Sequence, residues 1–259
     1  MPTPARISPS ATGSTNPPSA GGGSRILIGY ATRTGTYGTS ADAAAHFTTA
    51  DLSVGAAVVD GIGHSDALHT LVPHVAVTAA RIAAVSGAPA GLLTGGGMMS
   101  TADVDGARPN AVAVVAHARP GSPTTICWTG DSRASGWDGV RLTAYTVDQT
   151  VATYLLEAGV AEEIAAGFRS RLKGSLAEVV PETASKVLIP AGQLVILTSD
   201  GIHDQVLADV MEALVHQHQD DPQALAEALV AAAAADGTGY RDDATAIVLH
   251  PGSGLHPGH

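Results

Sequence analysis

Short apolar runs rich in Val, Ile and Thr recur along the chain and predict a protein with several β-strands. Each run spans five to seven residues and is too short for a typical helix, and turn residues such as Gly, Pro and Asp stand beside most of them. We predict strands over residues 25–30, 54–59, 110–116, 124–128, 194–198 and 244–249.

Longer segments between these runs carry the spacing of amphipathic helices, which we predict over residues 74–85, 147–158, 204–216 and 222–235. Pro73 suits the first position of the first helix. Strands and helices do not alternate strictly, and no Rossmann or Walker phosphate loop is present, so a doubly wound nucleotide-binding sheet is not expected. The glycine-rich segment 92–106 lacks the GK[ST] ending and is expected to be a flexible loop.

The two ends of the chain differ in composition from the middle. Residues 1–24 are rich in Pro, Ser, Thr and Gly, contain no apolar stretch typical of a signal peptide or membrane span, and are expected to form a disordered arm. This arm is either a solvated extension or a regulated tail with phosphorylation sites. The tail at 251–259 is also expected to be loose. The folded domain is expected at 25–250, because no internal break or repeat divides it.

The charge and cysteine content exclude several classes of function. The net charge is −11, and only 13 of 259 residues are Lys or Arg, which argues against a nucleic-acid partner. Cys127 is the single cysteine, so an intrachain disulfide and a cysteine-rich zinc site are both excluded, and its apolar neighbours predict a core position. We expect a cytoplasmic protein without a membrane partner.

Acidic residues stand at four junctions between apolar runs and turns. Asp60 follows one predicted strand, Asp131 and Asp200 follow two others, and Asp242 and Asp243 come just before the last. One Asp-Gly pair is ordinary turn chemistry, but four such junctions in one domain indicate that carboxylates are gathered together. Because gathered carboxylates repel one another, the pattern predicts a hard divalent cation between them.

These junctions form an ordered series of motifs. The series is "DGIGH" at 60–64, "GDSRASGWDGVRLTAYTVDQT" at 130–150, "PAGQLVILTSDGIHDQV" at 190–206 and "RDDATAIVL" at 241–249. In order and spacing it resembles the metal-dependent protein phosphatase (PPM) family, the type 2C serine/threonine phosphatases, in its bacterial form. The resemblance covers residues 25–250 and implies an α+β fold, a four-layer αββα sandwich of two antiparallel sheets flanked by helices.

The resemblance also implies a set of metal ligands. The Asp60 carboxylate would bridge two ions, and the Gly61 carbonyl would contribute a further oxygen. Asp200 and Asp242 would bind the same pair of ions, and Asp131 would help to hold a third, weaker ion. Oxygen ligands suit Mn²⁺ or Mg²⁺ better than zinc, so two such ions, with a third weakly bound, are the expected cofactors.

Around these ligands the sequence keeps some features of the family and departs from others. Asp42 falls where the family has an acid just outside the ligands, and Asp243 stands where an asparagine is usual. Tyr37 occupies the place of the phosphate-binding arginine, with Arg33 nearby but displaced, and Ala41 replaces a common acid.

The remaining candidates are histidines and one arginine. His64 lies two places beyond the position at which animal members carry a histidine, and it is the candidate general acid for the leaving serine oxygen. His69 and His203 are expected at the surface or just outside the ligands. Arg133 is expected to pair with a nearby acid, and Trp137 is expected in the core.

Together these features predict a serine/threonine protein phosphatase that hydrolyses phosphoserine and phosphothreonine through a metal-bridging water, without a covalent phosphoenzyme. The expected partners are a phosphorylated protein substrate and a serine/threonine kinase or its targets, and the protein is expected to be a monomer. Two alternatives stay open. One is a weakly active or non-catalytic regulatory binding module, and the other is a partner-switching phosphatase of a sigma-factor circuit.

Overall fold

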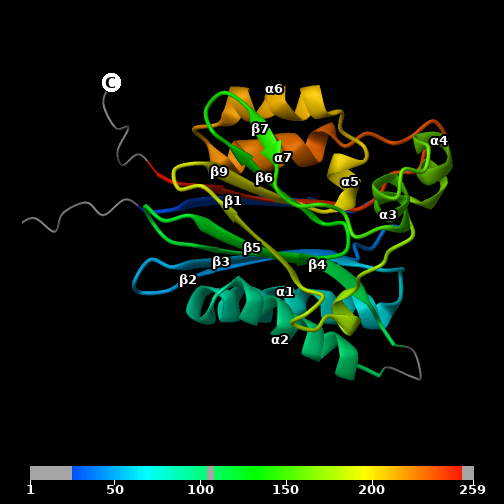
Figure 1. Ribbon diagram of the computed structural model, residues 1–259. Coiled ribbons are helices and arrows are strands. Elements are labelled where there is room, and N and C mark those ends of the chain that lie inside the picture. The colour runs from blue at the N-terminus through cyan, green and yellow to red at the C-terminus, as the bar shows by residue number, and fades with distance from the viewer. Residues whose placement is uncertain (1–24, 104–107, 253–259) are drawn as a thin grey trace, which may run out of the picture.

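The computed structural model describes residues 25–103 and 108–252, so the predicted arm at 1–24 and most of the predicted tail at 251–259 lie outside the described residues. Two antiparallel sheets of five strands each lie face to face, with helices covering both outer faces (Figure 1). The predicted α+β sandwich is therefore confirmed.

The first sheet has the strand order β1-β10-β9-β6-β7. Its strands are β1 Leu27–Arg33, β10 Ala244–His250, β9 Leu194–Thr198, β6 Arg133–Trp137 and β7 Leu142–Ala144. The second sheet has the order β2-β3-β4-β5-β8. It contains β2 Asp42–Thr48, β3 Val54–Gly61, β4 Ala111–Ala118, β5 Thr124–Thr129 and β8 Ser185–Ile189.

Helices cover the sheets in two pairs (Figure 1). Helix α7, Pro222–Ala232, packs on β1 and β10, and α6, Ala208–His218, packs against α7. Helix α1, Asp66–Ser86, packs on β2 and β3 and contacts α2, Ala88–Thr101. Five shorter helices complete the set, and α3 to α5 are grouped at one end of the sandwich in Figure 1. They are α3 Val151–Glu157, α4 Glu162–Ala165, η1 Ala166–Phe168, η2 Leu176–Glu178 and α5 Asp200–His203.

The core has three layers, which explains why the central strands are apolar on both faces. In β9, Val195 and Leu197 point into the layer between the sheets, while Ile196 packs under α6 and α7. In β3, Val58 faces the other sheet and Val59 packs against α1 and α2. Successive side chains of a strand point to opposite faces, so a strand between two apolar layers needs apolar residues throughout.

All six predicted strands are confirmed, with ends shifted by a few residues, but four further strands were missed: β2, β6, β7 and β8. The alanine-rich β2 has the composition of a helix, yet it pairs with β3 along its whole length. Strand β7 has three residues, and β8 exposes alternate residues as a sheet edge does.

The prediction that a helix starts at Pro73 was wrong, because α1 begins at Asp66 and contains Pro73. Ser65 caps its start by accepting a hydrogen bond from the Leu68 amide over 3.2 Å. Burial of Leu68 and Val72 before the proline favours the longer helix. This helix is also the one described helix that is long and apolar enough to span a bilayer, and here it packs on the second sheet.

The flexible loop predicted at 92–106 was also wrong for the part that the structure describes, because α2 runs through Thr101. Its glycines allow close packing rather than flexibility. A Cβ at Gly91 would lie 2.5 Å from the Ala79 carbonyl oxygen of α1, and one at Gly96 would lie 2.9 Å from the Leu176 carbonyl oxygen. The other predicted helices exist: α3 and α6 start four residues later than predicted, with α3 beginning after the Thr150 cap, and α7 starts at Pro222 as predicted but ends at Ala232.

Candidate active site

The predicted site acids lie at the end of the sandwich where α3 to α5 are grouped (Figure 1). Asp42 is the first residue of β2 and lies directly opposite Asp60, the penultimate residue of β3. Asp200 begins α5 immediately after β9, and Asp242 comes just before β10. Strands from both sheets therefore contribute carboxylates at this end.

A hydrogen-bonded link through Ser199 joins the two sheets beneath these acids. The Ser199 hydroxyl donates to a carboxylate oxygen of Asp42 over 2.7 Å, and it accepts from the Thr245 amide over 3.0 Å. Burial raises the pKa of Asp42 to about 6, although the Ser199 hydrogen bond acts in the opposite direction. Asp42 therefore ties the second sheet to the first rather than facing solvent.

Asp60 and Asp200 lie close enough to perturb each other's ionisation. Burial raises the pKa of Asp60 well above its usual value, and the nearby negative charges of Asp200, Asp42 and Asp131 raise it further. Burial also raises the pKa of Asp200 to about 8, with contributions from the charges of Asp131 and Asp242. The structure thus brings the four predicted metal-binding aspartates, Asp60, Asp131, Asp200 and Asp242, into one electrostatic cluster.

Two glycines beside these acids allow close backbone approach. A Cβ at Gly61 would lie 2.8 Å from the Ala41 carbonyl oxygen, and a Cβ at Gly201 would overlap the Asp243 carbonyl. No other residue fits at either position without a shift in the backbone or in a packed neighbour. The Asp-Gly pairs therefore combine a carboxylate with a place where a second chain segment lies against the backbone.

Asp243 has a different role from its neighbour Asp242. Its two carboxylate oxygens accept hydrogen bonds from the Gly35 amide over 2.6 Å and from the Ala41 amide over 2.7 Å. The side chain is buried, with 5% of the residue exposed. Asp243 thus holds both ends of the 35–41 loop, which carries Tyr37, against the start of β10.

A cavity of about 520 Å³ opens beside the acid cluster. Its walls come from β6, α3, α5 and the chain between them, and comprise Asp131, Arg133, Asp148, Thr150, Ala152, Thr153, Leu156, Arg169, His203 and Asp204. Asp131 and Asp204 both line it. Burial raises the pKa of Asp131 to about 6, and the charges of Asp148 and Asp204 raise it further. The Asp131 and Asp204 carboxylates could hold a further cation.

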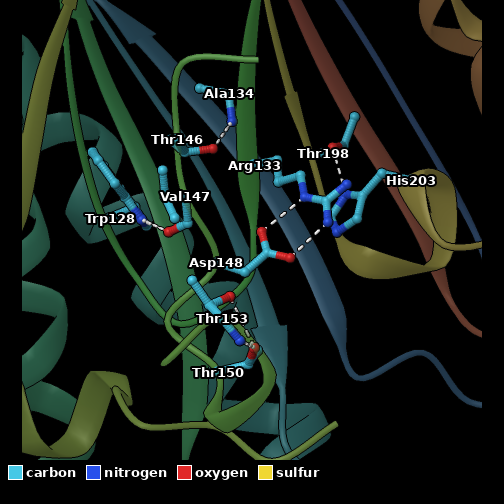
Figure 2. A network of polar contacts seen from close by, with 10 residues as sticks. All are labelled: Trp128, Arg133, Ala134, Thr146, Val147, Asp148, Thr150, Thr153, Thr198 and His203. Carbon is cyan, nitrogen blue, oxygen red and sulfur yellow. Dashed lines mark hydrogen bonds and ion pairs between the residues drawn. The ribbon is translucent and has the colours of Figure 1, made fainter. Parts of the chain in front are cut away.

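A two-point ion pair forms one wall of this cavity (Figure 2). Arg133 donates from Nε and from a terminal nitrogen to the two oxygens of Asp148, over 2.8 and 2.6 Å. The predicted pairing of Arg133 with a nearby acid is confirmed. His203 lies beside the arginine with Nδ1 3.1 Å from the Thr198 hydroxyl, and burial holds its pKa well below the usual value, so its ring is neutral at pH 7.

His64 lies in an aromatic group near the acids. Its ring is 4.1 Å from that of Tyr37, which is 6.0 Å from the ring of Tyr240. Burial and a hydrogen bond with Asp242 raise the pKa of Tyr240 above its usual range, so this group extends to the acid cluster. His64 is exposed, as a proton donor to a substrate must be.

Arg33 does not replace the missing phosphate-binding arginine. Its guanidinium donates to the carbonyl oxygens of Ala231 and Ala233 at the end of α7, which directs it away from the acids. Tyr37, at the family's arginine position, is 66% exposed and carries no charge. The acid cluster therefore has no arginine partner from the first strand.

Sequence reasoning missed three residues of this region: Ser199, Asp148 and Asp204. Asp204 was detectable, because it lies four residues beyond Asp200 in a helical turn and so comes near the same face. Ser199 and Asp148 gave no such signal, since their partners lie 157 and 15 residues away in sequence.

The donor chemistry of the cluster fits a hard divalent cation, although no metal geometry is formed. Within residues 25–103 and 108–252 no group of three or more His, Cys, Asp or Glu side chains is arranged to hold a metal ion. The cluster is nevertheless built from carboxylates whose like charges raise one another's pKa values. A cation between them would offset that repulsion, so the predicted ligands remain chemically suitable.

The fold is shared with solved bacterial phosphatases. Stp1 from Staphylococcus aureus aligns with a TM-score of 0.74 and 16% identity over 88% of this chain and 96% of its own. The PPM Ser-Thr phosphatase MsPP from Mycobacterium smegmatis, solved with cacodylate, gives a TM-score of 0.67 and 21% identity over 88% and 99%. PstP/Ppp from Mycobacterium tuberculosis gives 0.64 and 21% over 87% and 98%.

The sequence by itself matches no family model and no curated protein. The identities of 15 to 21% are low, but the alignments span nearly the full length of each neighbour. The chain therefore has the fold of the PPM serine/threonine phosphatases.

Proposed function

We propose that this protein is a metal-dependent phosphatase that hydrolyses phosphoserine and phosphothreonine in proteins. The observation that carries the proposal is the carboxylate cluster at one end of a phosphatase fold, where burial and the charges of neighbouring carboxylates raise the pKa values of Asp60 and Asp200. Such a cluster is costly for a fold unless cations use it. Its position beside an open cavity leaves room for a substrate.

The residues assigned to the cations follow from this cluster. Asp60, Asp200, Asp242 and the Gly61 carbonyl would hold two Mn²⁺ or Mg²⁺ ions, and Asp131 would help to hold a third. When bound, the two ions supply positive charge for the phosphoryl oxygens and a water of lowered pKa as nucleophile. Only oxygen donors take part, which agrees with the preference of these ions.

Other residues of the chain position these groups. Ser199 orients Asp42 behind Asp60, and the Arg133–Asp148 pair fixes the cavity wall beside Asp131. Asp243 holds the loop that carries Tyr37, which in turn stacks on His64. We assign to a ring nitrogen of His64 the proton that the leaving serine or threonine oxygen requires.

The test is hydrolysis of p-nitrophenyl phosphate and of a phosphothreonine peptide with Mn²⁺, and again with excess chelator. Asp60→Asn and Asp200→Asn should each lower kcat by at least about a hundredfold, because each removes a ligand charge. Asp138→Asn, at an exposed turn outside the site, is the matched control and should keep full activity. Equal activity with and without chelator would remove the metal from the proposal.

One observation favours a second candidate, a weakly active or non-catalytic binding module. Arg33 is engaged at the end of α7 and Tyr37 carries no charge, so phosphate has no arginine partner from the first strand. The same assays separate the two candidates: measurable binding of the phosphothreonine peptide without Mn²⁺-dependent turnover supports the binding module.

The partner-switching alternative differs only in substrate, and preferential hydrolysis of a phosphorylated sigma-factor regulator would support it. A cytoplasmic location, a monomeric state and a kinase partner remain predictions.

A further inference from the structure

Positive charge is scarce in this protein and is concentrated beside the candidate active site. The chain has 13 Lys and Arg residues against 24 Asp and Glu. Three of the 13 fall within the five residues 169–173, read as RSRLK: they are Arg169, Arg171 and Lys173. All three are exposed. No second stretch of this length in the printed sequence holds as many.

The RSRLK segment is attached to the loop that carries Asp131. The Lys173 amide donates to the Gln149 carbonyl over 2.7 Å, and Leu172 forms a β-bridge with Thr150. Gln149 in turn bonds to Gly130 through both its backbone amide and its side-chain oxygen, over 2.9 and 3.0 Å. Gly130 directly precedes Asp131. The segment is therefore held at a set position along the rim of the site rather than hanging free.

The cavity extends from the acids to this segment. Asp131 and Asp204 line it together with Arg169 and Leu156. A peptide whose phosphorylated residue reached the acids would therefore have its neighbouring residues beside RSRLK. This geometry makes the segment a candidate contact for the residues that flank a phosphoserine or phosphothreonine.

Aromatic rings hold two of the three charges at the surface. The Arg171 guanidinium carbon lies 5.1 Å from the centre of the Phe168 ring, and the Lys173 ammonium lies 4.9 Å from the centre of the Tyr154 ring. Arg169 differs, because it forms an exposed ion pair with Glu162 over 3.0 Å. The salt bridges of residues 25–103 and 108–252 do not include Arg171 or Lys173. These two cations are thus oriented but not neutralised.

We propose that Arg171 and Lys173 bind acidic residues flanking the phosphorylated residue, so that the enzyme selects acidic segments of its phosphoprotein substrates. The inference rests on the proposed function and adds a substrate class to it. The physical reason is charge complementarity: an acidic protein repels an acidic substrate, and a local pair of cations at the rim of the site reverses that repulsion where the substrate enters.

The experiment compares two phosphothreonine peptides of equal length, one with Glu and one with Lys at the flanking positions. Each is assayed with Mn²⁺ against the unsubstituted protein and against Arg171→Gln/Lys173→Gln. The matched control is Arg141→Gln/Lys186→Gln, which removes the same charge from exposed positions outside the RSRLK segment. Hydrolysis of p-nitrophenyl phosphate, which has no flanking residues, reports on the catalytic centre alone.

The unsubstituted protein and the control variant should prefer the Glu peptide by about tenfold in kcat/KM. The Arg171/Lys173 variant should prefer it by less than about threefold, and its hydrolysis of the aryl phosphate should be unchanged. The preference should shrink as salt is added, because exposed charges are screened. An unchanged preference in the variant overturns the inference, as does the absence of any preference for the Glu peptide in the unsubstituted protein. If the unsubstituted protein hydrolyses no aryl phosphate, the proposed function fails and the inference with it.

Discussion

Asp243 offers the sharpest test of how the structure supports the site, because one buried carboxylate holds two ends of a loop. Its oxygens accept hydrogen bonds from the Gly35 and Ala41 amides over 2.6 and 2.7 Å. Asp243→Ala removes both bonds and leaves two amides without a partner. Hydrogen bonds to a charged group contribute about 1.5 kcal/mol or more each, so the expected loss in the free energy of unfolding is about 3 kcal/mol.

A second substitution separates hydrogen bonding from charge. Asp243→Asn retains one acceptor oxygen, but its amide group faces the other backbone N–H and cannot accept from it. Both substitutions remove the negative charge, which is one of the causes that raise the pKa of Asp42, so this relief is common to both. Asp243→Asn should therefore be more stable than Asp243→Ala by about 1 kcal/mol, the contribution of one neutral hydrogen bond.

The measurement is urea unfolding at pH 7 with excess chelator, so that cation binding does not contribute to stability. Asp138→Ala is the control, because Asp138 also accepts two backbone N–H bonds, both over 2.8 Å, but in an exposed turn. Water replaces those bonds in the variant, and the loss should be clearly smaller. If Asp243→Ala and Asp138→Ala destabilise the protein equally, the two buried hydrogen bonds do not hold the loop in the way described.

Three further expectations concern the acid cluster and the packing of the helices. In chelator, the free energy of unfolding should fall as pH rises from 4 to 8. Burial raises the pKa of Asp42 to about 6 and that of Asp200 to about 8, and such carboxyls favour the folded state only while they are protonated. Urea unfolding midpoints measured across this pH range test the direction of the change. Saturating Mn²⁺ should raise the thermal midpoint at pH 7.5 and flatten this pH dependence. Gly91→Ala should destabilise the protein, because the added Cβ would meet the Ala79 carbonyl oxygen. Gly97 lies in the same helix with open space around it, so Gly97→Ala should stabilise the protein by about 0.5 to 1 kcal/mol. Calorimetry measures both changes.

The parts of the fold that could be predicted are those in which burial on both faces leaves a continuous apolar run. Strands β3, β4, β9 and β10 are such strands, and each was predicted. Strands β2, β7 and β8 lie at or near sheet edges or are very short, and their sequences carry no run of that kind. Helix α2 was missed for a different reason: its glycines are poor helix formers but allow contact with α1. Tertiary packing determines the secondary structure of these segments, and the local sequence pattern does not indicate that packing.

The residues of the candidate site also fall into those that the sequence pattern indicates and those that only tertiary contacts reveal. Asp60, Asp131, Asp200 and Asp242 could be picked out because acids interrupt or adjoin apolar runs, and they were expected to converge because several strands end there. The hydroxyl of Ser199 could not be connected with a carboxylate 157 residues away, because that contact exists only once two sheets have stacked.

The position of the acid cluster between the sheets links its chemistry to the stability of the fold. Asp60 belongs to the second sheet, whereas Asp200 and Asp242 stand at the ends of strands of the first, so their mutual repulsion acts across the interface. The hydrogen bond from the Ser199 hydroxyl to Asp42 and the bond from the Ala41 amide to Asp243 cross the same interface and oppose that repulsion. A divalent cation bound by carboxylates from both sheets would replace that repulsion by attraction and draw the two layers together. Catalytic competence and the closure of this end of the sandwich would then depend on the same ligands, and the pH and Mn²⁺ dependence of stability would report on the candidate site.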